Sequence, residues 1–453
     1  MDQLVGEPGC DVVALVPRTS DSSLLFCTPA APVASNRLVL PNLRLAFEPT
    51  IEDITQQLAE LLGGPVTLLR ANALAWRENF DAASIVVEVE PLSWTPAASL
   101  GWEPIDESRL EAVDPSWARA SVASWLHERA SGWSDRRPQW SRPGWMAEAS
   151  RWLHGQMEAA GYREPQPAKI HHLWGLSVVL SADSLNGTAY LKCSGDHFRA
   201  EAAVTQALAT RSPALVPDVI AVDSERGWLL MRDLRAHILG DQPEREWWRG
   251  LDALVTLQKQ WIGRTDELLD LGVDNRPLVT LAAWADDSVR DLDLLSGLTA
   301  AERENWSSQV PAMVASCHNL ADLGLKPSLV HGDFHPWNVV SGDRGAQIFD
   351  WTDAAVAHPF LDLVTYIMRS PDPDLRQAML LRYLDAWESD LPRTDLHDVG
   401  HLALVVGALH QAHTFRRLIP TVMPDDLAQL RGGDAQWLRR AMRLSTGGIE
   451  AAY

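Results

Sequence analysis

Four residues in the C-terminal half have side chains that suit catalysis. The segment LVHGDFHPWNVV contains His331, Asp333 and Asn338, and twelve residues later Asp350 ends the apolar run AQIF. An aspartate can accept a proton from a hydroxyl group, and asparagine and aspartate supply the hard oxygen ligands that suit Mg²⁺. HGD and PWN are also good turn formers, so a polar turn without chemistry is the alternative.

A lysine and a glutamate upstream extend this set. The expected strand TAYLKCS places Lys192 in a half-buried position, and Glu201 follows in the first turns of the expected helix FRAEAAVTQALATR. A strand lysine paired with a helix glutamate can hold nucleotide phosphates, and the alternative is a lysine that extends to solvent. The order of lysine, glutamate, aspartate and metal ligands predicts phosphoryl transfer.

The surrounding pattern predicts two lobes. From about residue 168 the expected strands are KIHHLWG, SVVLSAD, TAYLKCS, PDVIAVDS and GWLLMRDL, with one helix among them. After Leu234 nearly all of the chain has a helical pattern, apart from the polar loop and its neighbours. A small β-rich lobe followed by a large helical lobe is the expected layout.

The motifs HGDFHPWN and IFDW resemble the aminoglycoside phosphotransferase and choline kinase family, which has a protein-kinase-like fold. The resemblance covers roughly residues 166–453. It implies that Asp333 is the catalytic aspartate and that Asn338 and Asp350 bind Mg²⁺. It also implies a small-molecule kinase that uses ATP or GTP.

The same resemblance implies roles for further residues. His331 and Asp362 are expected to support the catalytic loop. WLLMRDL matches the hinge between the lobes, which meets the purine. The implied nucleotide-binding residues are Lys192, Glu201, Ser177, Leu230, Met231 and Asp233.

Two positions depart from the family pattern. Trp337 lies where the family often has glycine, so a bulky ring stands beside a metal ligand. The loop expected to cover the phosphates, HHLWGLSVVL, has only Gly175 and Ser177 at its turn. Backbone N–H groups can still bind phosphate at such a turn.

The acceptor is expected in the helical lobe. Candidate acceptor-binding residues are Asp353, Trp337 and His410, although structural histidines and a solvated helix face are the alternative. The carboxylates at 353 and at 385–390 favour an amine-bearing acceptor, such as an aminosugar, an aminoglycoside or an amino alcohol. A neutral sugar or nucleoside is the next alternative, and a catalytically silent nucleotide-binding module is the rival class.

The first hundred residues predict a small α/β unit. CDVVALVP and SSLLFCTP predict a hairpin, a helix is expected over 51–62, and PVTLLRANALAW and ASIVVEVEPLSW predict strands. The unit weakly resembles a Nudix domain. However, Gln56 stands where that family has arginine, and Gln57 and Leu61 stand where it needs glutamates, so we expect no hydrolase activity.

We therefore predict an α+β chain, a two-lobed protein-kinase-like fold preceded by a small α/β domain. The expected domains are an N-terminal domain (1–105), a Trp/Arg/Pro-rich connector with a helix over 145–160 (106–165), a β-rich lobe (166–235) and a helical lobe (236–453).

Composition excludes several classes of protein. The chain has 453 residues and a formal net charge of −21, which disfavours nucleic acid and anionic membranes as partners. Its four cysteines are scattered, and MDQLVGEPGCD lacks the features of a signal peptide. We expect a cytoplasmic protein with a nucleoside triphosphate, a small hydroxyl-bearing acceptor and Mg²⁺ as its partners.

Overall fold

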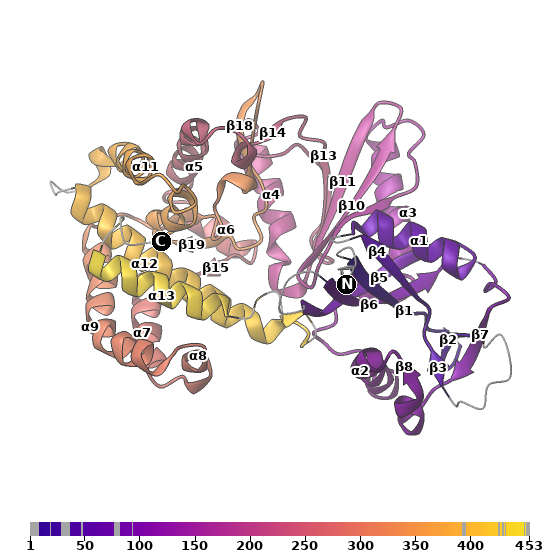
Figure 1. Cartoon of the computed structure of the whole chain (residues 1–453). Coiled ribbons are helices and arrows are strands. Elements are labelled where there is room, and N and C mark those ends of the chain that lie inside the picture. Colours follow the sequence, from indigo (N-terminus) through magenta and orange to yellow (C-terminus); the bar gives the residue numbers. More distant parts are fainter. Residues whose placement is uncertain are drawn as a thin grey trace, which may run out of the picture. The chain divides into compact units, whose positions relative to one another are not determined.

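The computed structural model describes residues 9–18, 20–28, 37–46, 49–76, 82–92, 94–391, 396–424, 426–427, 430, 432–447 and 449. The chain divides into two compact units. The first comprises 1–187, 191–195 and 422–428, and the second comprises 188–190, 196–421 and 429–453. Both helices and sheets are present, which confirms the predicted mixture of α and β structure (Figure 1).

A mixed sheet forms the centre of the first unit. Its order is β4 (Asn42–Ala46), β1 (Gly9–Leu15), β6 (Ala82–Pro91) and β5 (Val66–Trp76), and only the β1–β6 pair is parallel. Side chains alternate between the two faces of β1. Val12 packs in one apolar cluster with residues of α1 (Ile51–Leu62), whereas Val13 packs in another with Trp125 of α2 (Arg119–Ser131). The sheet is therefore covered on both faces.

The helix predicted over 51–62 is confirmed as α1. Thr50 accepts a hydrogen bond from the amide of Asp53, whose carboxylate in turn accepts one from the amide of Thr50. Gly63 ends the helix in the left-handed conformation, with φ of 93°. These caps satisfy backbone groups that the ends of a helix leave without partners.

The predicted hairpin at the start of the chain forms only in part. The chain turns back so that the amide of Leu25 donates to the carbonyl oxygen of Val16, but β1 pairs with β4 and β6. Strand β2 (Ser23–Cys27) instead pairs with β7 (Leu100–Pro104). Short strands β3 (Leu38–Val39) and β8 (Val113–Asp114) pair in parallel.

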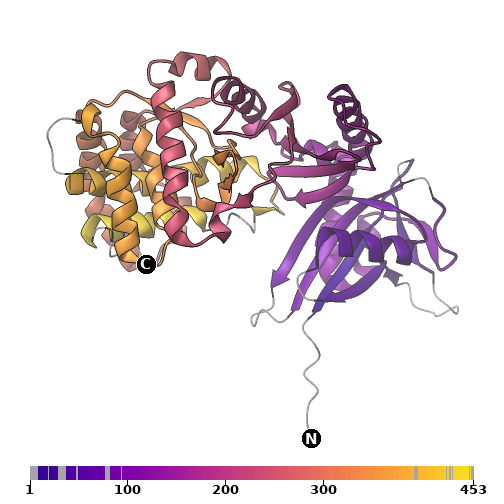
Figure 2. The ribbon, with the colours of Figure 1, turned by 90° about the horizontal axis from the view of Figure 1, so that it is seen from above.

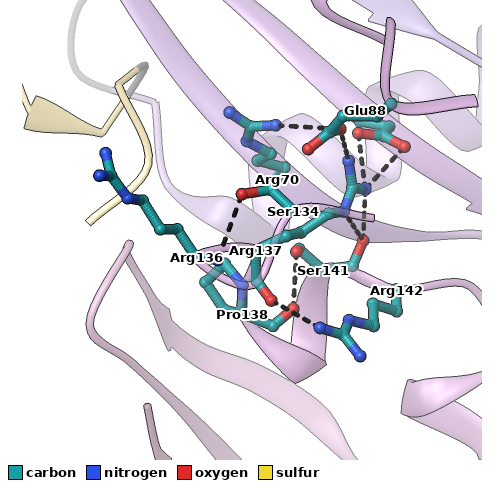
Figure 3. Close-up of polar contacts among 9 residues, drawn as sticks. Arg70, Glu88, Ser134, Arg136, Arg137, Pro138, Ser141 and Arg142 are labelled. Atoms are coloured by element: carbon teal, nitrogen blue, oxygen red, sulfur yellow. Dashed lines mark hydrogen bonds and ion pairs between the residues drawn. The ribbon is translucent and has the colours of Figure 1, made fainter. Parts of the chain in front are cut away.

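The Trp/Arg/Pro-rich segment packs on this sheet through a buried ion cluster (Figure 3). The Arg137 side chain is 0% exposed and donates to Glu88 of β6 at 2.9 Å and to Glu128 of α2 at 2.5 Å. Its guanidinium also lies 4.3 Å from the ring centroid of Trp133. The predicted helix from Trp145 follows as α3 (Trp145–Ala159).

The strands expected after residue 168 are present. In the first unit β9 (Lys169–Leu173) pairs with β10 (Ser177–Ser184), and in the second β12 (Val219–Asp223) pairs with β13 (Trp228–Arg232). The border between the units passes through β11 (Gly187–Ser194). The predicted helix after β11 is α4 (Ala200–Arg211).

The second unit is mainly helical, as predicted, and α12 and α13 lie side by side in it (Figures 1 and 2). One large apolar core joins its helices. Besides α4, these helices are α5 (Trp248–Trp261), α6 (Thr265–Asp270), α7 (Leu278–Ser288), α8 (Leu292–Ser296), α9 (Ala300–Asp322), α10 (Leu363–Ile367), α11 (Pro373–Asp385), α12 (Leu396–Leu418) and α13 (Gly433–Gly447).

Small sheets in the second unit carry the polar loop. One has the order β14 (His237–Ile238), β17 (Val339–Gly342) and β18 (Gly345–Ile348), and another has the order β15 (Asp274–Asn275), β19 (Ala355–Ala357) and β16 (Ser328–Val330). Across the described ranges, no helix is long and apolar enough to cross a membrane.

Candidate active site

The polar loop begins where the buried strand β16 ends. The Asp362 carboxylate, which is 0% exposed, accepts hydrogen bonds from the amide of His331 at 2.9 Å and from the amide of Gly332 at 2.8 Å. Burial raises the pKa of Asp362 to about 7, although the two amides oppose this rise. Asp362 thus holds the first two residues of the loop from inside the unit.

His331 joins the two segments that carry the predicted catalytic residues. Its Nε2 donates to the Phe349 carbonyl oxygen at 2.9 Å, and its Nδ1 accepts from the Asp333 amide at 3.4 Å. These partners require the neutral ring with its proton on Nε2. Burial lowers the pKa of His331 to about 4, which agrees with that neutral form.

Asn338 and Asp350 come together at one end of the β17–β18 hairpin. Val339 pairs with Ile348 in this hairpin, and the amide of Phe349 donates to the Asn338 carbonyl oxygen at 3.0 Å. The Asn338 side-chain nitrogen donates to the Asp333 carbonyl oxygen at 3.0 Å, so its side-chain oxygen is the end that can bind a cation.

Asp350 has an unusual backbone conformation. Its φ is 66°, in the left-handed region that residues other than glycine seldom adopt. Its carboxylate accepts a hydrogen bond from the Thr352 hydroxyl at 2.7 Å. Such strained residues occur often at functional sites, where the surrounding contacts hold them.

Asp333 is the accessible carboxylate of this loop. Its side chain is 45% exposed, and the Oδ2 atom lies 3.6 Å from Nε2 of His335. Burial is the largest single influence and opposes ionisation, but the interactions with the His335 and His331 rings together outweigh it, so the pKa of Asp333 lies below its ordinary value. The side chain is therefore an ionised carboxylate at neutral pH.

A close backbone contact explains the glycine of the HGD motif. Gly332 has φ of 87°, and a β-carbon added to it would overlap the Asp353 carbonyl oxygen. The chain beyond Asp350 therefore passes directly over the polar loop. Asp353, a predicted acceptor-binding residue, is half-buried there.

Trp337 has a fixed orientation although its ring is 42% exposed. Its indole nitrogen donates to Asp241 at 3.1 Å, and its ring packs edge-on against Trp247 with centroids 5.9 Å apart. A β-carbon on Gly240 would lie 2.5 Å from the Trp337 ring. The ring therefore lies on the backbone of Gly240. The next residue in the sequence is Asn338, a predicted metal ligand.

The predicted nucleotide-binding residues fall in both units. Lys192 (7% exposed) belongs to the first unit, whereas Glu201 (3% exposed), Leu230, Met231 and Asp233 belong to the second. Leu230 and Met231 lie on β13, and the Asp233 amide donates to the Thr188 carbonyl oxygen at 3.2 Å. Their roles toward a nucleotide remain predictions.

The turn predicted to cover the phosphates contains an acidic neighbour. The Ser177 hydroxyl accepts a hydrogen bond from the Trp174 indole at 2.8 Å. A β-carbon on Gly175 would lie 2.7 Å from the Asp426 β-carbon. This close approach adds a reason for glycine at position 175, but a carboxylate there disfavours a phosphate.

His410, the remaining acceptor candidate, is only 1% exposed and lies on α12. It is therefore not part of a solvated helix face. His410 and Asp333 both belong to the second unit.

The segment that contains the candidate site is similar to known enzymes. Residues 194–397 match the phosphotransferase enzyme family. The predicted resemblance is confirmed for this segment, which contains Asp333, Asn338, Asp350 and Asp362. The segment is therefore similar to phosphotransferase enzymes, as the sequence predicted. No curated protein gives a significant match.

Solved structures of phosphotransferases are similar to this chain at low identity. A choline/ethanolamine kinase family protein from Mesorhizobium loti is 17% identical with a TM-score of 0.47, and the match covers 68% of this chain and 99% of that chain. The choline kinase LicA from Streptococcus pneumoniae is 12% identical with a TM-score of 0.45, and the match covers 66% of this chain and 99% of that chain. The macrolide 2'-phosphotransferase MphH from Brachybacterium faecium is 19% identical with a TM-score of 0.42, and the match covers 65% of this chain and 98% of that chain.

Two glutamines that contact Asp362 or the polar loop were not predicted. Gln258 of α5 is 0% exposed, and its side-chain nitrogen lies 3.3 Å from the Asp362 carboxylate. Gln411 of α12 donates to the Gly332 carbonyl oxygen at 2.5 Å. Both stand among other polar residues of their helical segments, and their helices reach the loop only in the folded chain.

Proposed function

We propose that the protein is a small-molecule kinase that transfers the γ-phosphoryl group of ATP or GTP to a hydroxyl group of a small acceptor. The observation that carries this proposal is the joining of two loops by His331. The His331 ring accepts a hydrogen bond from the backbone amide of Asp333. It donates one to the carbonyl oxygen of Phe349, the residue before Asp350. Phosphoryl transfer depends mainly on such positioning, because the protein takes little covalent part in it.

Asp333 is the proposed catalytic residue. Its ionised carboxylate is accessible on the loop and can orient the acceptor hydroxyl and accept its proton. Asp362 and Gln411 hold the backbone of the preceding residues, so the carboxylate is presented from a fixed loop. A fixed orientation lowers the entropy cost of reaching the reactive geometry.

Asn338 and Asp350 are the proposed Mg²⁺ ligands. The donor set fits this ion, since both provide hard oxygen atoms and the Asn338 amide is turned with its nitrogen toward the protein. Within the described part of the chain, no three His, Cys, Asp or Glu side chains form a metal cluster. Two protein ligands are enough for Mg²⁺, which is usually bound by one or two carboxylates together with phosphate oxygens and water. When bound, the ion neutralises charge on the phosphates.

Lys192 is proposed to contact the nucleotide phosphates, with Glu201 as its ionic partner. Both side chains are almost fully buried, and a buried charged group is stable only when an opposite charge or a ligand pairs with it. Leu230, Met231 and Asp233 are proposed to meet the purine, and Ser177 to lie in the turn over the phosphates.

The test is an acceptor screen with the full chain. Hydroxyl-bearing metabolites, amino alcohols and aminoglycosides are incubated with γ-labelled ATP or GTP, with Mg²⁺ or with EDTA. We expect label transfer to one acceptor class only when Mg²⁺ is present. Nucleotide binding without transfer to any acceptor class would instead favour a silent nucleotide-binding module.

A further inference from the structure

One face of α12 carries polar groups that the proposed catalytic steps do not use. His410, His413, Thr414 and Arg417 are spaced three, four and seven residues apart, so they lie on the same side of the helix. Arg276, which follows β15, reaches this face because its Nη1 donates to the Thr414 hydroxyl at 3.1 Å. We call these five residues the α12 basic cluster.

Positive charge exceeds negative charge in the α12 basic cluster. Arg417 donates to Oδ2 of Asp274 at 2.7 Å, and Arg276 donates to the same oxygen at 3.2 Å. Two guanidinium groups therefore share one carboxylate. Burial lowers the pKa of His410 and of His413, and the two arginines lower both further. The histidines are therefore neutral and can each donate one hydrogen bond.

Three buried nitrogen atoms of this cluster have no hydrogen-bond partner among the described residues. His410 is 1% exposed, and neither of its ring nitrogens has a hydrogen-bond partner among the described residues. The same holds for Nε of Arg276, whose residue is 7% exposed. Nearly all buried polar groups in proteins are paired with protein, water or ligand. Guanidinium and imidazole N–H groups together suit an anionic acceptor of hydrogen bonds.

The cluster is tied to the catalytic loop from two sides. Gln411, beside His410 in α12, donates to the carbonyl oxygen of Gly332, which directly precedes Asp333. The amide of Arg276 donates to the Val356 carbonyl oxygen at 2.8 Å in the segment that follows Asp353. A ligand at the cluster would thus lie on elements that contact the catalytic loop directly.

We propose that Arg276, His410 and Arg417 form an anion site that binds a carboxylate or phosphate group of the phosphoryl acceptor. This inference rests on the proposed kinase function and departs from the amine-bearing acceptor expected from the sequence. Part of the acidic stretch behind that expectation is already neutralised, because Asp390 pairs with Lys259 at 2.9 Å.

Binding of simple anions tests the site itself. Isothermal titration calorimetry of the full chain uses phosphate and, separately, acetate, at constant ionic strength. We expect binding of at least one anion, weakened about tenfold in Arg417→Gln and in His410→Gln, because each change removes a hydrogen bond to a charged group. The side chain of Arg417 is 36% exposed, so its variant keeps the fold even if His410→Gln does not.

Arg416→Gln is the matched control. Arg416 is the neighbour of Arg417, but its guanidinium pairs with Asp291 at 2.8 Å and with Asp293 at 2.5 Å. We expect anion binding to be unchanged in this variant. Equal losses in Arg416→Gln and Arg417→Gln would show an adventitious surface effect, and absence of phosphate and acetate binding to the wild type would overturn the site.

Kinetics then distinguish the acceptor claim from the kinase proposal. With hydroxy acids and phosphorylated alcohols as acceptors, Arg417→Gln should raise KM about tenfold with little change in kcat. Transfer only to amine-bearing or neutral acceptors, with KM equal in wild type and Arg417→Gln, would overturn the inference while the kinase proposal stands. No transfer to any acceptor, with anion binding still dependent on Arg417, would contradict the kinase proposal and leave only the anion site.

Discussion

The His331 ring donates a hydrogen bond to the carbonyl oxygen of Phe349 over 2.9 Å. This contact fixes the position of Asp350, the next residue, relative to the loop that begins at His331. Because the same ring accepts the Asp333 amide, a single neutral imidazole sets the register of the two segments. The proposed catalytic aspartate and the proposed metal ligand Asp350 are therefore positioned by one side chain.

Gly332→Ala should lower both stability and activity. Its φ of 87° and the approach of the Asp353 carbonyl oxygen require glycine, so alanine adds backbone strain and a steric clash. We expect a loss of at least about 2 kcal/mol in the free energy of unfolding, measured in urea. Gly324→Ala is the control, since φ is 75° and no atom lies within 4 Å of the added carbon. It should cost only about 1 kcal/mol, and equal costs would contradict the close contact.

Asp362 should make stability fall as pH rises. Its folded pKa is about 7 and its ordinary value is 3.8, so the folded protein binds this proton more strongly than the unfolded chain. Its contribution should decrease between about pH 4 and pH 7, by up to about 4 kcal/mol, and then level off. Urea unfolding of the wild type and of Asp362→Asn, which cannot titrate, measures the difference. A difference that is constant over this range would show that Asp362 does not titrate there.

Arg137→Met should destabilise the first unit. The change leaves the buried carboxylates of Glu88 and Glu128 without their main cation, which costs about 3–5 kcal/mol. Arg136→Met, at the exposed neighbouring position, should change stability by less than about 0.5 kcal/mol. Thermal unfolding followed by circular dichroism compares the two, and similar melting temperatures would contradict the cluster's structural role.

Asp350→Ala should abolish the Mg²⁺ dependence of nucleotide binding, and Asn338→Ala should weaken it less. A charged ligand contributes more to binding a divalent cation than a neutral amide oxygen does. Titration of ATP and GTP with and without Mg²⁺ gives the dependence for each variant. An unchanged effect of Mg²⁺ in Asp350→Ala would remove that residue from the metal site.

Local signals in the sequence predicted many elements correctly. Thr50 and Gly63 mark the two ends of α1, and the apolar run before Asp350 is strand β18. The loop residues from His331 to Asn338 lie within eight positions of one another, so their proximity follows from the sequence itself. Because these residues are close together in the sequence, the family motif could be recognised from the sequence alone.

The remainder depends on contacts between distant segments. Arg137 looks like one of several arginines in a polar stretch, yet only the fold places it between Glu88 and Glu128. His410 could not be distinguished from a surface histidine, because helical spacing alone does not tell which face is buried. The partial hairpin at the start of the chain is a similar case, since the residues that pair with β1 lie 29 or more positions away in the sequence.

The most direct test of the kinase proposal is single-turnover phosphoryl transfer by Asp333→Asn. The variant keeps the size of the side chain but removes the carboxylate that accepts the hydroxyl proton. We predict that transfer from γ-labelled nucleotide slows by about 10²–10⁴-fold, while nucleotide affinity and the melting temperature remain close to wild type. Transfer within about threefold of the wild-type rate would contradict the catalytic role of Asp333 and the account built on it.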